Sequence, residues 1–223
     1  MATRKLNFLS IVLLGRHNPQ ILNHAFLVHN EVLPKEKPFF REDLKEGESP
    51  FTSFISTPPV TQIAYEMYSL QVQDDRYQAI DATGNDPARS PIIGITERYF
   101  GRLLRYTPLQ VGGMNLNFDV AIDSGEEAEA IDSAIGIDYA RAKAAFAADS
   151  LVADIAATFG FLNGRMSVAS AKPADGKSVA KVHFNYEFKY SNNIDTFLSN
   201  LRSVGELVEY CRRFFGRIGV KDE

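Results

Sequence analysis

The chain has 223 residues, 45% of them hydrophobic and 23% charged, which is typical of a globular protein that folds without disulfides or a structural metal. Its formal net charge of −4 argues against a nucleic-acid partner, because phosphate binding depends on clustered lysine and arginine. The lone cysteine, Cys211, excludes a disulfide framework and a cysteine-based zinc site and favours a reducing compartment, so we expect a cytoplasmic protein.

The first predicted elements are a strand and a helix. Residues 5–14 are mostly apolar but too few to span a bilayer, and no small-residue cleavage site follows them, so we expect a core strand and no membrane partner. Asn18 and Pro19 then begin a helix that runs to about Leu33, because asparagine is a good N-cap and proline fits the first helical position. The predicted inward face of this helix comprises Ile21, Leu22, Ala25, Phe26 and Val28.

A charged loop over 34–50 leads into extended segments, which we expect to form strands over 51–57, 60–73 and 76–82. Ser90-Pro91 repeats the signature of an N-cap followed by proline and begins a helix over 91–105. The polar side of this helix carries a basic stripe, which is a candidate docking surface for a protein partner. The stripe comprises Arg98, Arg102 and Arg105.

The strictest alternation lies in two segments, 114–122 and 182–190. Apolar residues such as Phe118 and Phe184 alternate there with polar ones, which is typical of strands that bury one face. If both strands belong to one sheet, their polar residues share its other face and form a candidate binding surface. This polar face comprises Asn115, Asn117, Asp119, His183, Asn185 and Glu187.

Between these strands we expect a helix and a hairpin. Ser124 and Glu127 form a capping box for an alanine-rich helix that runs to about residue 148. Residues 150–190 predict a three-stranded antiparallel meander, in which Asn163-Gly164 favours a type I′ turn. The first strand, 150–160, is equally compatible with a helix, because alanine and leucine fit both periods.

A long helix over 193–217 closes the chain. Its apolar residues recur at alternating spacings of three and four, and further apolar positions widen this stripe, which favours docking on a sheet over a free coiled coil. If the stripe exceeds what the sheet covers, the excess would form a dimer or partner interface. The stripe comprises Ile194, Phe197, Leu201, Val204, Val208, Cys211, Phe215 and Ile218.

The order of these elements favours hairpins over crossovers. We therefore expect a single α+β domain over 1–223, with a mostly antiparallel sheet, helices packed on one face and a long C-terminal helix. No phosphate-binding loop or nucleophile elbow is present, and His24 and His29 lack the spacing that lets two imidazoles share a metal on a helix. We expect no cofactor and no metal.

Three short segments carry a resemblance to a known family: Gly113-Met114-Asn115-Leu116-Asn117-Phe118, His183-Phe184-Asn185-Tyr186 and Asp195-Thr196-Phe197-Leu198. Through them and through its element order, the chain resembles an uncharacterised, sporadically distributed family of bacterial α+β proteins. The resemblance implies an α+β fold and a prokaryotic or phage setting, and it brings no catalytic residues.

Two functions follow from these observations. The first is a non-enzymatic interaction or scaffold subunit of a bacterial or phage assembly, which acts through contacts with a protein partner or as a homo-oligomer. The alternative is a small-molecule or nucleotide-processing enzyme on the polar face, in which His183 acts as acid–base and Asp119 or Glu187 orients it.

Overall fold

The computed structural model describes residues 2–122, 130–131, 133–134, 155–171, 179–190 and 193–222. These residues divide into two compact units, each discontinuous in sequence. Unit 1 comprises Met1–Asn7, Asn115–Tyr186 and Gly205–Glu223, and unit 2 comprises Phe8–Met114 and Glu187–Val204.

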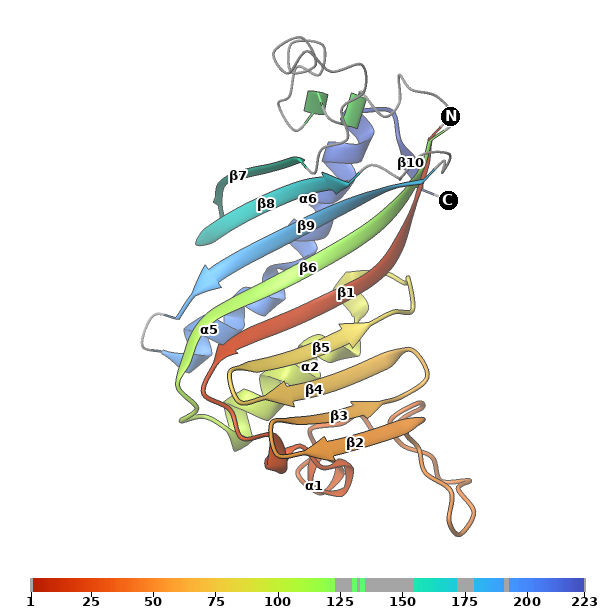
Figure 1. Ribbon diagram of the computed structural model, residues 1–223, viewed down its shortest axis with the longest axis vertical. Helices are drawn as coiled ribbons and strands as arrows, with labels where there is room; N and C mark the ends of the chain where they lie inside the picture. The colour runs from red at the N-terminus through yellow and green to blue at the C-terminus, as the bar shows by residue number, and fades with distance from the viewer. Residues whose placement is uncertain are drawn as a thin grey trace. The chain divides into compact units, whose positions relative to one another are not determined.

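The described strands form one ten-stranded sheet in the order β2-β3-β4-β5-β1-β6-β9-β8-β7, with β10 paired to β1 (Figure 1). Antiparallel pairs join β1 to β5, β2 to β3, β3 to β4, β4 to β5 and β7 to β8, whereas β1 and β10 pair in parallel. This confirms the predicted α+β fold with a mostly antiparallel sheet and a long C-terminal helix. The strands are β1 (Thr3–Gly15), β2 (Ser53–Thr57), β3 (Val60–Ala64), β4 (Tyr68–Gln73), β5 (Arg76–Asp81), β6 (Leu109–Ala121), β7 (Ile155–Phe161), β8 (Gly164–Ala171), β9 (Val179–Lys189) and β10 (Lys221–Asp222).

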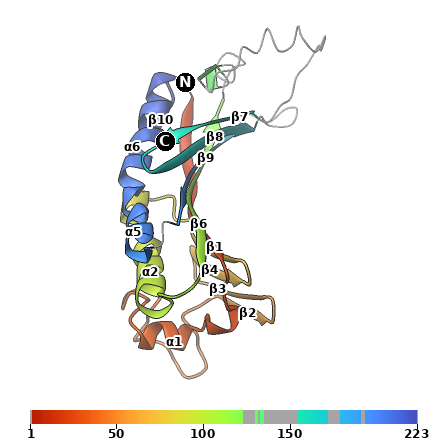
Figure 2. The same ribbon diagram turned by 90° about the vertical axis from the view of Figure 1, so that its left-hand side faces the viewer.

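In unit 2, η1 contacts β3 and β4, α2 contacts β5, and Phe197 of α5 contacts Phe188 of β9. The core of this unit is aromatic: Tyr77 stacks on Tyr99 with ring centroids 5.6 Å apart, and the Tyr77 hydroxyl lies 3.1 Å from that of Thr96. Figure 2 shows α2 on one side of these strands. The helical segments of this unit are η1 (Pro19–Ile21), α1 (His24–His29), η2 (Pro87–Arg89), α2 (Pro91–Arg98), η3 (Tyr99–Leu103), α5 (Ile194–Ser199) and η4 (Asn200–Ser203).

Unit 1 packs helix α6 (Val204–Arg217) on one face of β6 and β9 (Figure 2). Phe118 of β6 and Phe184 of β9 meet edge to face at 5.8 Å, and Phe215 of α6 contacts both at 5.1 and 5.6 Å. The two alternating strands therefore bury the same side, as the sequence predicts.

Arg4 ties the two ends of the chain together within unit 1. Its side chain is buried and its Nε donates to Asp222 at 2.5 Å, while its guanidinium lies 4.5 Å from the ring centre of Phe215. The same pairing brings Thr3 opposite Lys221 in the β1–β10 ladder. A charged group is tolerated in this core because a carboxylate and an aromatic ring compensate for its lost hydration.

The predicted helix over 19–33 is wrong in its continuity. A 3-10 turn ends at Ile21, and Asn23 caps a new helix by accepting from the Phe26 amide at 3.3 Å. The break resets the helical phase, so Leu27 is buried and Phe26 is exposed, against the predicted inward face. Asn18 does act as the expected cap, through a bond from Gln20 N at 3.1 Å.

Other boundaries differ for local reasons. The segment 60–73 is two strands, because the chain turns at 65–67 between β3 and β4. The predicted helix over 91–105 loosens into a π-helical turn after Arg98. In the long C-terminal helix, Asn200 Nδ2 donates to the carbonyls of Thr196 and Phe197, and this competition accompanies the 3-10 turn between α5 and α6.

The predicted meander is present in its described part, with residues 155–161 in a strand rather than a helix. Its hairpin turn lies one residue earlier than predicted: Phe161 pairs with Gly164, and Leu162 takes the positive φ of 49°. The capping box at Ser124 and most of the helix expected to follow it lie outside the described residues.

Candidate functional site

The polar residues predicted for one sheet face alternate with buried ones on β6 and β9. Five belong to unit 1 and are half-buried: Asn115, Asn117, Asp119, His183 and Asn185. Glu187 follows on the same side of β9 but belongs to unit 2. The structure thus places the five unit 1 residues on the side of the sheet opposite Phe118 and Phe184, because strand side chains alternate between faces.

His183 is held by an amide within this polar face. Its Nδ1 donates to Oδ1 of Asn117 at 2.8 Å, across the neighbouring strands β9 and β6. The sequence suggested Asp119 or Glu187 as the orienting group, but the hydrogen bond goes to Asn117. Asp119 Oδ1 is buried and has no hydrogen-bond partner among the described residues.

Replacing His183 with glutamine is expected to reduce the loss of stability on acidification. Burial lowers the pKa of His183 below its usual value of 6.5, so the unfolded chain binds this proton more readily than the folded one. The stability that neutral His183 contributes is fully present above about pH 6.5. It is lost as the pH falls from there through the pKa of His183 in the folded protein. The glutamine amide keeps an N–H donor for Asn117 and does not ionise in this pH range.

Urea unfolding at about pH 7.5 and about pH 5 measures this effect as the difference in unfolding free energy between the two conditions. The variant should show a smaller difference than the native chain. His17 and His24 also have a pKa lowered by burial, so the remaining slope is theirs. Equal differences for the variant and the native chain would contradict the burial of His183.

The three arginines of the predicted basic stripe serve separate contacts in unit 2. Arg98 Nε donates to the carbonyl of Val32 at 2.9 Å, and Arg105 pairs with Asp195 at 2.6 Å. Arg102 lines a shallow depression of about 580 Å³. Arg98 lines the same depression, but its Nε is engaged by the Val32 carbonyl, and Arg105 is engaged by Asp195.

The apolar stripe of the C-terminal helix leaves little excess for an interface. Its residues from Ile194 to Phe215 are buried apart from Val208, which is half-buried like Ile218 at the helix end. Cys211 is 1% exposed, and burial raises the pKa of its thiol, which is opposite to the activation of a nucleophilic cysteine. The stripe therefore belongs to the hydrophobic core, in agreement with the prediction that its width favours docking on a sheet.

The most exposed apolar strand lies elsewhere, at β2. All five of its residues are exposed, with Phe54 at 44% and Ile55 at 50%, and it is one of the two terminal strands of the described sheet (Figure 1). Phe54 pairs with the buried Ile63 and Ile55 with Gln62, so the two side chains lie on opposite faces. Sequence reasoning predicted the strand and missed the edge.

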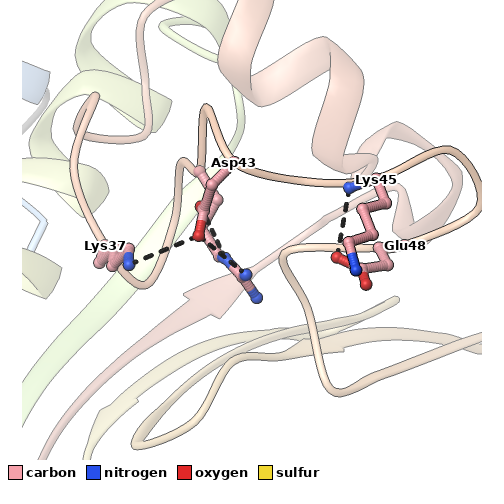
Figure 3. A network of polar contacts seen from close by, with 5 residues as sticks. Lys37, Asp43, Lys45 and Glu48 are labelled. Atoms are coloured by element: carbon pink, nitrogen blue, oxygen red, sulfur yellow. Dashed lines mark hydrogen bonds and ion pairs between the residues drawn. The ribbon is translucent and has the colours of Figure 1, made fainter.

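Charge around β2 is unevenly distributed. The preceding loop carries local pairs: Arg41 Nε donates to Asp43 at 3.2 Å and Lys37 lies 3.8 Å from the same carboxylate, while the Lys45 amide donates to Glu48 (Figure 3). Residues 51–65, by contrast, contain no charged side chain. The uncharged run is visible in the sequence, but only the strand order shows that it lies at an edge of the sheet.

Within the described residues, no cluster of three or more histidine, cysteine or acidic side chains is arranged to hold a metal ion. No helix among them has the length and apolarity needed to cross a membrane. The structure therefore directs attention to two features, the polar face around His183 and the edge at β2.

The comparisons with known proteins find no matching family model, no matching curated protein and no matching solved structure. The resemblance to a bacterial α+β family accordingly stays a prediction.

Proposed function

We propose that the protein is a non-enzymatic interaction subunit that works through protein–protein contacts, and that its β2 edge pairs with the β2 edge of a second copy of the chain. The observation that carries the proposal is an exposed edge strand with apolar side chains on both faces. Unpaired backbone groups on such an edge are a template for another strand, and natural edges are usually protected by charge or proline.

The charge pattern favours a second copy as the occupant. Across a two-fold axis, a charged group that lies close to the axis faces the same charge of the other copy. The chain as a whole carries −4, whereas 51–65 is free of charge, so this edge can meet its own copy without repulsion. Strand residues 53–57 are flanked by Pro58 and Pro59, which end the hydrogen-bonding segment on one side.

The register of such a pair is restricted. In an antiparallel pair, residues directly opposite each other project to the same face of the sheet, and side chains alternate between faces along each strand. When two β2 strands pair about a two-fold axis, one residue must therefore lie directly opposite the same residue of the other copy. Within β2 the central candidates are Phe54 and Ile55. The first register makes an aromatic pair and the second an aliphatic pair, and both bury side chains that are now about half exposed.

The proposal predicts a dimer that one charge disrupts. Light scattering on the native chain should give about twice 24.8 kDa at micromolar concentration. Ile55→Lys should raise the dissociation constant by about tenfold or more, because the change places a lysine of each copy in the shared edge. Leu162→Lys is the matched control, since Leu162 is 53% exposed in the β7–β8 turn, and it should leave the dimer intact.

Cysteine cross-linking tests the register directly. Phe54→Cys and Ile55→Cys differ by one position, and only the residue that faces its own copy has Cα atoms at about 4.5–5.5 Å, within disulfide range. One variant should oxidise rapidly to a covalent dimer, and the other should not. Native Cys211 is buried and gives no background. A native chain that stays monomeric, or cross-linking of Leu162→Cys at the same rate, would contradict the proposal.

The polar face supports the same choice of function. An amide neither takes up nor releases a proton near neutral pH, so the His183–Asn117 bond positions the imidazole and does not relay protons. This geometry favours the interaction subunit over the enzymatic alternative, which requires a carboxylate beside the histidine.

A further inference from the structure

Unit 1 contains a cavity of about 670 Å³ beside helix α6, within the size range of small-molecule sites. One wall is a single side of α6, with residues spaced i, i+3, i+4, i+7 and i+8: Tyr210, Arg213, Phe214, Arg217 and Ile218. Among the described residues, the other lining side chains are small: Ala130, Ser133 and Ala134.

The α6 wall combines an apolar floor with a cationic rim. Phe214 is only 8% exposed and Tyr210 is half-buried against Phe159, Phe161 and Phe184, so both rings are fixed in place by the core of unit 1. Arg213 and Arg217 are one helical turn apart and exposed. A ligand in the cavity therefore contacts aromatic carbon on one side and guanidinium groups at the opening.

Both guanidiniums are available to a ligand. Glu209 is engaged by Arg212 at 2.7 Å, and Arg213 reaches the same carboxylate only at 3.9 Å. Arg217 has no ion pair in the described part of the chain. Burial raises the pKa of the Tyr210 phenol, and the charges of Arg217 and Arg213 act in the opposite direction.

The backbone itself does not favour an anion at this place. The cavity opens at the last two turns of α6, where free carbonyl groups give the helix dipole its negative end. Two arginines stabilise that helix end, and they also make the rim cationic despite it. An anion held here depends on the side chains alone, which makes its binding sensitive to each arginine.

We propose that this cavity binds an anionic amphiphile, a carboxylate carried on an apolar body, with the carboxylate between Arg213 and Arg217 and the body against Phe214 and Tyr210. A guanidinium forms paired hydrogen bonds with a carboxylate, and the aromatic floor removes the body from water. The site lies on different residues from the β2 edge and does not depend on the proposed dimer.

Isothermal titration of the full chain tests the proposal with four probes. We expect the protein to bind at least one of two carboxylates: decanoate, which has an alkyl body, or 1-naphthoate, which has an aryl body. Acetate has the charge without the body and decanol the body without the charge, and each should bind at least about tenfold more weakly, because each retains only one of the two contacts.

Three variants locate the binding. Arg217→Gln and Arg213→Gln should each weaken the better carboxylate by about tenfold to a hundredfold, as expected for the loss of a hydrogen bond to a charged group. Ala134→Phe fills the cavity at an exposed position and should abolish binding without changing charge. Lys181→Gln is the matched control, because it removes one positive charge from an exposed residue of unit 1 that does not line the cavity.

The outcomes are distinguishable from those of the β2 experiments. Ile55→Lys should bind the carboxylate as the native chain does, whether or not the native chain is a dimer. The proposal is overturned if neither carboxylate binds, if Lys181→Gln weakens binding as much as Arg217→Gln, or if Ala134→Phe leaves the affinity unchanged. Circular dichroism of each variant confirms that it is folded.

Discussion

Replacing Phe184 with alanine is expected to lower the free energy of unfolding by about 3–5 kcal/mol. Phe184 is fully buried on β9, and its ring meets four other aromatic rings at centroid distances of 5.3 to 6.2 Å: Phe118, Tyr210, Phe214 and Phe215. Alanine removes the apolar area of the ring and leaves a cavity. The surrounding rings come from a sheet and a helix, which limits their collapse into it.

Urea or guanidinium unfolding followed by circular dichroism measures this loss as a fall in the midpoint at constant slope. Phe184→Leu should cost about 1–2 kcal/mol, because it keeps most of the volume. Lys181→Ala, an exposed position on the same strand, should change stability by less than about 0.5 kcal/mol. An alanine variant no less stable than the leucine variant would show that this aromatic cluster is not the core of unit 1.

Position 112 is expected to have no space for a side chain, even for the methyl group of alanine. A Cβ built on Gly112 would lie 2.3 Å from Cε2 of Phe188 and 2.8 Å from Cζ of Phe197. Both rings are fully buried and in contact with each other at 5.0 Å, so neither has free space to move into. Gly112→Ala should therefore destabilise the protein by about 1–3 kcal/mol, although alanine is normally the better residue in a strand.

Two further variants separate the steric cause from a general effect of glycine replacement. Gly160 lies in β7 with nothing within 4 Å of its Cβ position, so Gly160→Ala should be neutral or stabilising by up to about 1 kcal/mol. Phe188→Leu in the Gly112→Ala background should recover part of the loss, because it removes the ring atoms that the methyl group meets. Additive losses in the double variant would contradict the proposed clash.

All of these unfolding measurements require the same protein concentration, because a dimer is stabilised by mass action and a monomer is not. Dilution of the native chain serves as an internal test. If the β2 edges pair, the unfolding midpoint should fall on dilution, and the midpoint of Ile55→Lys should not.

The regular strands are predictable from the sequence because their pattern is local. Alternation in 114–122 and 182–190 places Phe118 and Phe184 on one face and Asn117 and His183 on the other, and the structure has this arrangement. The same reasoning identifies the C-terminal apolar stripe and its burial. In each case the spacing of apolar residues along one strand or helix determines which side chains are buried.

Boundaries were less predictable because they depend on competition between individual hydrogen bonds. Asn23 starts a second helix where apolar spacing alone predicts continuity, and Leu162 takes the positive φ expected at Asn163. The first outcome depends on a side-chain cap at Asn23 and the second on the register of the β7–β8 pair. Periodicity carries no information about either.

The sequence by itself determined the order of the strands and helices, the faces they bury and the absence of charge over 51–65, because each of these is a property of neighbouring residues. Only the tertiary structure decided that β2 has no second neighbour in the described sheet, that Phe188 and Phe197 close over Gly112, and that Arg213 and Arg217 line a cavity. These facts concern residues far apart in the chain. They are set by which surfaces meet when the elements pack, and no local pattern encodes that.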